Sequence, residues 1–171
     1  GPIAGFIVAV PTLIIGLYLS DIVEPMGEGG FSFGSSIIMI LLSKLILGVT
    51  PLSADFNIQL HPIAFAGWVG LFVTAINLFP IGQLDGGHII YSLFGKKSKN
   101  WTKYFFIFLV SLIYFWPSWG IWAVLLIVIT RFKSAPLLND DVLPLKKHRK
   151  IGYTAIVIFI LTFVPVPIEI I

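Results

Sequence analysis

The segment Asn77 to His88, NLFPIGQLDGGH, contains the residues of this chain whose types and spacing are most suited to chemistry. Asp85 is the only Asp, Glu, Lys or Arg residue between positions 57 and 95. A carboxylate in hydrocarbon surroundings costs about 2.5 kcal/mol or more, so we expect it to face a cavity, a cation or a polar partner. Asn77, eight residues earlier, carries an amide that can donate a hydrogen bond to a developing oxyanion.

Proline and glycine residues surround this carboxylate. Pro80 lacks a backbone N–H group, and Gly86 and Gly87 can adopt backbone conformations that other residues avoid. Together they predict a broken helix around Asp85, which frees backbone carbonyl and amide groups. At membrane depth such a break persists only where it is buried in protein or lines a wet cavity. The simpler interpretation is an acidic residue in an interfacial turn, because Leu-Asp-Gly is also an ordinary turn sequence.

The composition places the chain among membrane proteins. Of its 171 residues 57% are hydrophobic and only 11% are charged, and the mean hydropathy is +1.00. A soluble domain carries about 25% charged residues, and several apolar runs approach the length of about 20 residues that a membrane-spanning helix needs. The chain has no cysteine, which excludes disulfides and cysteine-based zinc sites.

These runs predict an all-α, polytopic membrane protein with about five transmembrane helices and one short re-entrant or interfacial helix. We interpret residues 1–171 as a single transmembrane domain. The short helix is expected at 35–48, where fourteen residues span only about 21 Å. The other expected helices are 3–20, 61–94 with its break, the hairpin 104–116 and 121–130, and 151–164.

The charges predict the orientation of these helices. Ten of the eleven Lys and Arg residues fall in two predicted loops, 96–103 and 131–150, and only Lys44 lies elsewhere. The positive-inside rule places these loops on the cytoplasmic side, or on the equivalent side of an organelle membrane. The acidic loops, 21–34 and 50–60, then face the other side. A simpler role for the basic residues is contact with anionic lipid headgroups.

The motif resembles that of a known family. Asn77-x-x-Pro80 followed by Leu84-Asp85-Gly86 is similar to the second signature of the site-2 proteases, which are intramembrane zinc metalloproteases. Further similar segments are GPIAGF at the start, HPIAFAGWVGLFVTAINLFP before the motif, and PLLNDDVLPL and PVP after it. The resemblance covers nearly the whole chain and is strongest to the archaeal, cyanobacterial and plastid branch.

The resemblance implies a zinc site and a membrane substrate. Asp85 would be the carboxylate ligand of one Zn²⁺, and Asn77 would position the substrate or stabilise the tetrahedral intermediate. A catalytic zinc has three protein ligands and an open position for water, whose pKa it lowers to about 7. The implied partners are a transmembrane protein substrate and the lipid bilayer, with no nucleic acid. The oligomeric state is left open.

The chain departs from the family in one respect. The family's first signature, His-Glu-x-x-His, supplies two zinc ligands and the general base, and it is absent here, since none of His61, His88 and His148 is followed by Glu. We therefore expect the two histidine ligands to lie outside this chain, which would be the C-terminal portion of a longer enzyme and inactive alone. A non-catalytic homologue, or a transporter with an ion site at a broken helix, remains an alternative.

The three histidines themselves have simpler interpretations. His88 could share a helical face with Asp85, three residues before it, in a supporting role or, less simply, as a ligand. His61 is expected at the start of a helix and His148 in a basic loop.

Overall fold

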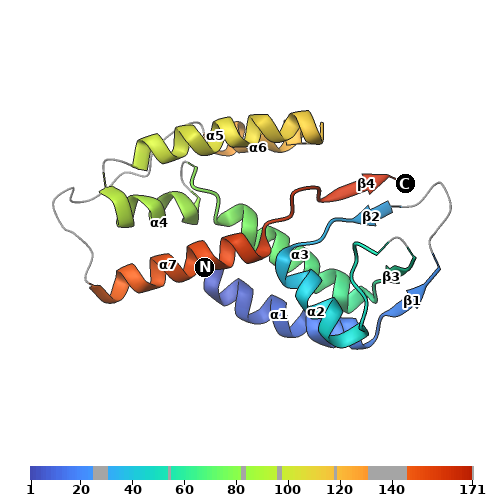
Figure 1. Ribbon diagram of the computed structural model, residues 1–171. Helices are drawn as coiled ribbons and strands as arrows, with labels where there is room; N and C mark the ends of the chain where they lie inside the picture. Colours follow the sequence, from blue (N-terminus) through green and yellow to red (C-terminus); the bar gives the residue numbers. More distant parts are fainter. Residues whose placement is uncertain are drawn as a thin grey trace. The chain divides into compact units, whose positions relative to one another are not determined.

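The computed structural model of the protein is mostly helical (Figure 1). The structure describes residues 1–24, 31–53, 55–81, 84–95, 98–117, 119–130 and 146–170. Within these ranges the helices are α1 (Pro2–Tyr18), α2 (Ile37–Leu47), α3 (Pro62–Asn77), α4 (Asp85–Phe94), α5 (Ser98–Phe115), α6 (Trp119–Thr130) and α7 (Lys146–Thr162). The strands are β1 (Asp21–Val23), β2 (Phe31–Phe33), β3 (Asn57–Gln59) and β4 (Ile168–Ile170).

The helices form where the sequence has long apolar runs, and local chemistry sets their ends. At the start of α2 the hydroxyl oxygen of Ser36 accepts a hydrogen bond from the Met39 N–H at 3.4 Å. Gly48 ends this helix in the left-handed conformation, with φ of 76°. The predicted short helix is therefore present. None of the described helices combines the length and the apolar character that a membrane crossing requires.

The four strands are the exception to the predicted all-α class. β1 pairs with β3 and β2 with β4, both antiparallel, so that Asp21 lies opposite Gln59. The expectation of loops without strands at 21–34 and 50–60 is wrong in this respect. Each strand has only three residues, too few for a period-two pattern to be recognised. Each partner is also distant in sequence, so local residues give no sign of the pairing.

The chain divides into two compact units, and the first contains residues 1–76 and 158–171. In it α1 and α3 run antiparallel in direct contact, because Gly16 lies against Ala64 and Gly67 against Leu13. A glycine at each contact lets the two backbones approach closely. The core of this unit consists of Ala9, Leu13, Leu17, Met39, Ala64, Trp68 and Leu71. The prediction of a single transmembrane domain stays a prediction.

The second unit contains residues 77–157. Its α5 packs against both α4 and α6 (Figure 1). The predicted hairpin is confirmed, since α5 and α6 are separate helices that pack against each other. Gly152 of α7 lies against the side chain of Leu93 in α4. This unit contains the whole motif from Asn77 to His88.

The two basic segments are only partly loops. α5 begins at Ser98 and α7 at Lys146, so several basic residues of the predicted loops 96–103 and 131–150 lie in the first turns of helices. The prediction was wrong here because an apolar run marks only the hydrophobic part of a helix, which continues into polar residues. Residues 131–145 lie outside the described part of the chain.

Candidate functional site

The helix breaks within the motif, as predicted. α3 ends at Asn77 and α4 begins at Asp85. Between them the chain turns tightly: the Ile81 N–H donates to the Phe79 carbonyl at 2.7 Å, and the Leu84 N–H donates to the Ile81 carbonyl at 3.2 Å. Gly82 and Gln83 lie outside the described residues. The break therefore separates the two predicted site residues by a short non-helical connection.

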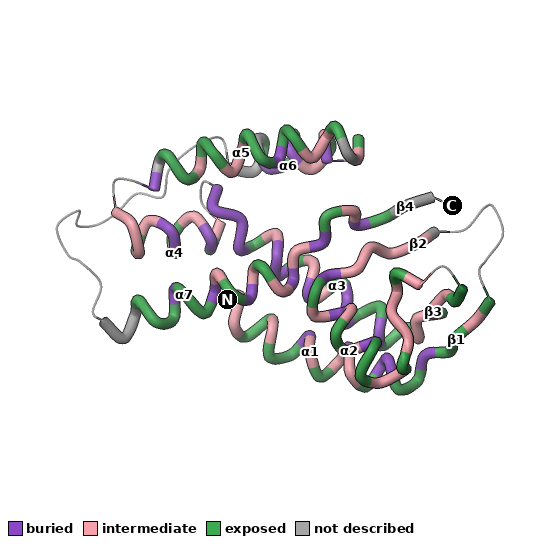
Figure 2. The backbone as a smooth tube through the Cα atoms, in the orientation of Figure 1, coloured by how far each residue is buried: buried purple, intermediate pink, exposed green. Residues whose placement is uncertain are grey.

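Residues 78–81 of this connection are buried, as Figure 2 shows in purple after α3. Phe79 is only 1% exposed, and the centroid of its ring lies 5.0 Å from the ring centroid of Phe105 and 6.3 Å from that of Trp119. The Thr102 hydroxyl donates a hydrogen bond to the Pro80 carbonyl at 3.0 Å. Side chains of α5 and α6 thus hold the break in place.

Gly86 brings the start of α4 against this connection. A Cβ atom at Gly86 would collide with the backbone carbonyl groups of Leu78 and Phe79. Gly86 and Gly87 were expected to open the helix, and this expectation is wrong, because both lie within α4 in helical conformation. The structural reason for Gly86 is close packing. It lets the first turn of α4 lie against the carbonyl groups of Leu78 and Phe79, which directly follow Asn77.

Asp85 is the first residue of α4 and is exposed. A negative charge is favourable at this position because the helix dipole is positive at its N-terminus. In the part of the chain that the structure describes, the carboxylate has no hydrogen-bond or ion-pair partner. No polar partner for it is found among these residues, and the expected cavity or cation stays a prediction. Asn77 is also exposed, at the end of α3.

The donor atoms near Asp85 suit part of a zinc site. Its carboxylate is a ligand type that zinc accepts, and no described residue competes for it. His88, exposed on the same helix three residues later, adds an imidazole. Among the described residues, however, no group of three or more His, Asp or Glu side chains is placed to hold a metal ion. The described residues therefore do not provide the complete set of three protein ligands.

The other two histidines lie elsewhere. His61 precedes α3. Its side-chain Nδ1 accepts a hydrogen bond from the backbone N–H of Ile63 at 3.2 Å, and its backbone N–H donates to the Ser20 hydroxyl at 3.0 Å. This confirms the predicted role at a helix start. His148 lies within α7, not in the predicted loop.

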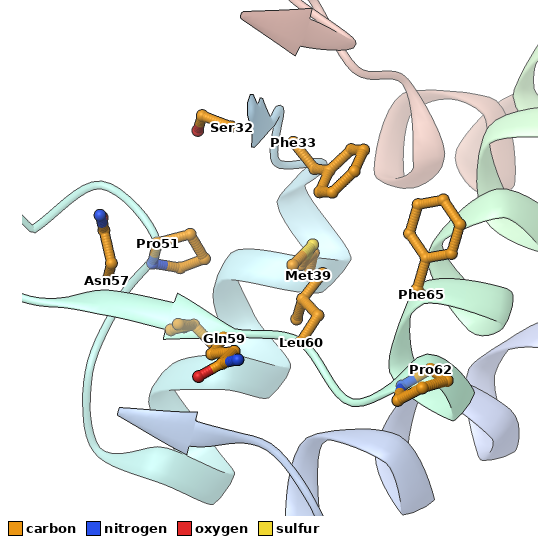
Figure 3. A pocket seen from close by; sticks show the side chains of 10 residues that line it. Ser32, Phe33, Met39, Pro51, Asn57, Gln59, Leu60, Pro62 and Phe65 are labelled. Carbon is orange, nitrogen blue, oxygen red and sulfur yellow. The ribbon is translucent and has the colours of Figure 1, made fainter. Parts of the chain in front are cut away.

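A hollow in the first unit contains none of the motif residues. It has a volume of about 410 Å³ and lies among α2, α3, β2 and β3 (Figure 3). Phe33, Met39 and Phe65 form its apolar part, whereas Ser32 and Asn57 lie at the opposite side. Neither this hollow nor the support that Phe79 and Thr102 give to the motif was predicted from the sequence. Thr102 lies 22 residues from Pro80, and no spacing rule connects the two.

Comparison with known proteins identifies the family. The model of peptidase family M50 matches residues 1–115, which include the whole motif. The chain belongs to peptidase family M50. This is the site-2 protease family, so the predicted family is confirmed. No solved structure matches the chain.

The relatives of this M50 chain include plant proteins. The probable zinc metalloprotease EGY1, chloroplastic, of Arabidopsis thaliana is 30% identical over 97% of the chain and 31% of its own length. The probable zinc metalloprotease EGY2, chloroplastic, of the same plant is 30% identical over 98% of the chain and 30% of its own length. The chain thus spans less than a third of these relatives. The DDT domain-containing protein PTM of Arabidopsis thaliana is 36% identical over 57% of the chain and 6% of its own length.

Proposed function

We propose that this chain supplies one part of the catalytic site of an intramembrane zinc metalloendopeptidase. The full-length enzyme would hydrolyse peptide bonds within or near transmembrane segments of membrane-protein substrates. One observation carries the proposal: in a member of family M50, the Leu-Asp-Gly motif presents an exposed carboxylate at the start of a helix, with no partner among the described residues. The similarity to the two plant proteins named as probable zinc metalloproteases supports it.

Asp85 would hold the zinc ion together with two imidazoles from outside this chain. A bound zinc ion polarises the scissile carbonyl and lowers the pKa of water to about 7. Asp85 would be kept in position by the contact of Gly86 with Leu78 and Phe79. The general base would also come from outside the 171 residues, so this chain alone would be inactive.

Asn77 would act on the substrate. Its side-chain amide would donate a hydrogen bond to the scissile carbonyl oxygen as that oxygen gains negative charge. Such a donor accelerates a reaction only if it is oriented in advance. Its place at the end of α3, next to the buried residues Leu78 and Phe79, supports such an orientation.

We also propose that the chain lies in a lipid bilayer, crossing it about five times with the basic segments 96–103 and 131–150 on the cytoplasmic or equivalent side. The composition supports this, as do large apolar side chains exposed along the helices. Examples are Val8 of α1 at 67%, Tyr104 of α5 at 65%, Ile121 of α6 at 70% and Val157 of α7 at 54%. In water such surfaces are unfavourable, whereas acyl chains would cover them.

Substitution of Asp85 in the full-length protein tests the proposed function. Asp85→Asn keeps the size of the side chain but removes its charge, so we expect both the zinc content and the cleavage of a tagged single-span membrane protein to fall. Asp55→Asn is the matched control, because Asp55 is also an exposed acid but lies outside the motif. Zinc is measured by mass spectrometry and cleavage by gel mobility. Unchanged zinc content and cleavage in Asp85→Asn would contradict the assignment.

A second candidate is a non-catalytic module of the same family. The match to PTM favours it, because that protein is named for a DDT domain and not for a protease. Under this alternative the folded full-length protein would bind no zinc and cleave nothing. The wild-type zinc measurement therefore distinguishes the two candidates.

A further inference from the structure

The hydroxyl of Thr102 makes an unusual hydrogen bond. A threonine within a helix commonly bonds to the carbonyl four residues earlier, and Thr12, Thr154 and Thr162 do so at 2.8, 3.0 and 2.8 Å. Thr102 lies 3.4 Å from that carbonyl, of Ser98, but 3.0 Å from the carbonyl oxygen of Pro80. Its shorter bond therefore leaves α5 and reaches the motif.

The Pro80 carbonyl needs such a partner because the helix is interrupted here. Pro80 is buried, and a buried carbonyl group without a hydrogen bond is unfavourable. Among the described residues of the connection, the turn bonds use the carbonyls of Phe79 and Ile81, and the Thr102 hydroxyl is the donor to that of Pro80. The Thr102 hydroxyl thus fills the place that a helical N–H would otherwise take.

This bond fixes the orientation of the peptide that leads to Asp85. The ring of Phe79 packs against Phe105 and Trp119, and such non-directional packing holds the segment in place without orienting its peptide groups. A hydrogen bond is directional, so it limits the rotation of the peptide plane after Pro80. α4 starts five residues after Pro80, and Gly86 presses its first turn against Leu78. Both constraints thus act on backbone within a few residues of Asp85.

We propose that Thr102 is a positioning residue for the zinc ligand Asp85, acting through the Pro80 carbonyl. This rests on the proposed function of Asp85. Groups that orient a metal ligand typically change metal affinity or activity by about 10- to 100-fold when removed. Because Thr102 acts through the backbone, its effect belongs at the lower end of this range.

The test uses the full-length protein with three variants. Thr102→Val keeps the shape of the side chain and removes the donor, Thr102→Ser keeps the hydroxyl, and Thr154→Val removes a hydroxyl that bonds only within its own helix. For Thr102→Val we expect zinc affinity, from competition with a chelator, and kcat to fall by about tenfold at unchanged KM. Thr102→Ser should restore both, and Thr154→Val should match the wild type. Equal values for Thr102→Val and Thr154→Val, or equal losses for the Val and Ser variants at Thr102, would overturn the proposal.

Amide hydrogen exchange distinguishes a failure of the proposal for Thr102 from a failure of the proposed function. We expect faster exchange at residues 78–90 in Thr102→Val than in Thr154→Val, whether or not zinc is bound. A wild-type protein without zinc would overturn the proposed function, and with it the role of Thr102 toward a zinc ligand. Unchanged exchange in Thr102→Val would overturn the link to Pro80 even in a protein that binds zinc.

Discussion

Replacing Gly86 by alanine tests whether the contact of α4 with the carbonyl groups of Leu78 and Phe79 determines the position of Asp85. A Cβ atom at this position would meet the carbonyl group of Leu78 and lie 2.5 Å from the carbonyl oxygen of Phe79, whereas ordinary van der Waals contact begins at 3.4 Å. These are backbone atoms of a buried segment, so they cannot rotate away. The start of α4 must therefore retreat by at least about 1 Å in this densely packed region.

A retreat of this size should affect both metal and substrate. Displacing a catalytic group by about 1 Å can lower the rate about 100-fold, and overpacking costs about 1–3 kcal/mol of stability. For Gly86→Ala in the full-length protein we expect about 100-fold lower kcat and a lower zinc content. Helix propensity alone predicts the opposite for stability, because alanine is better than glycine in a helix by about 1 kcal/mol.

Gly120→Ala is the matched control. Gly120 is the second residue of α6, as Gly86 is of α4, but the nearest atom to its Cβ position would be Cδ1 of Ile113 at 4.0 Å. We expect zinc content and cleavage of a single-span membrane protein to remain unchanged in this variant. The reasoning would be refuted by a Gly86→Ala protein that retains its zinc and cleaves as fast as Gly120→Ala.

Three further predictions concern the site and the first unit. Asn77→Ala should lower kcat by about 10²- to 10³-fold while zinc stays bound, and full activity would reduce Asn77 to a packing residue. Gly67→Ala should lower the thermal midpoint in detergent, because its Cβ would lie 2.5 Å from the Leu13 nitrogen and the overpacking costs about 1–3 kcal/mol of stability. The midpoint of Gly70→Ala should fall less, because its Cβ would lie 3.0 Å from Cβ of Ala9. Equal midpoints for the two variants would contradict the packing described. Removing zinc from the full-length protein with a chelator should stop cleavage, and restored zinc should restart it; cleavage that persists without zinc would exclude a zinc protease.

The helices could be predicted from the sequence because their signals are local. An apolar run, a serine before α2 and a glycine after it act within a few residues. The strands could not be predicted, because their pairing is not local: Asp21 of β1 lies opposite Gln59 of β3, and α2 lies between these two strands in the sequence. Helix starts in basic segments were also missed, since α5 and α7 begin before their apolar runs do.

The motif was visible in the sequence, but its support was not. The types and spacing of Asn77, Pro80 and Asp85 indicated both the chemistry and the break in the helix. The close contact of Gly86 and the hydrogen bond from Thr102 depend on how the chain folds back on itself, which no local pattern encodes. Glycine at position 86 was noted for its flexibility, whereas its small size is what the structure uses.

The central claim is that the Asp85 carboxylate binds zinc in the complete protein. The most direct measurement is an experimental structure of the zinc-loaded full-length protein, with the metal located by anomalous scattering at the zinc absorption edge. We expect an Asp85 carboxylate oxygen about 2.0–2.2 Å from the zinc ion, with two histidine nitrogens completing the protein ligands. A zinc ion bound elsewhere, with Asp85 still exposed and without a partner, would contradict the claim.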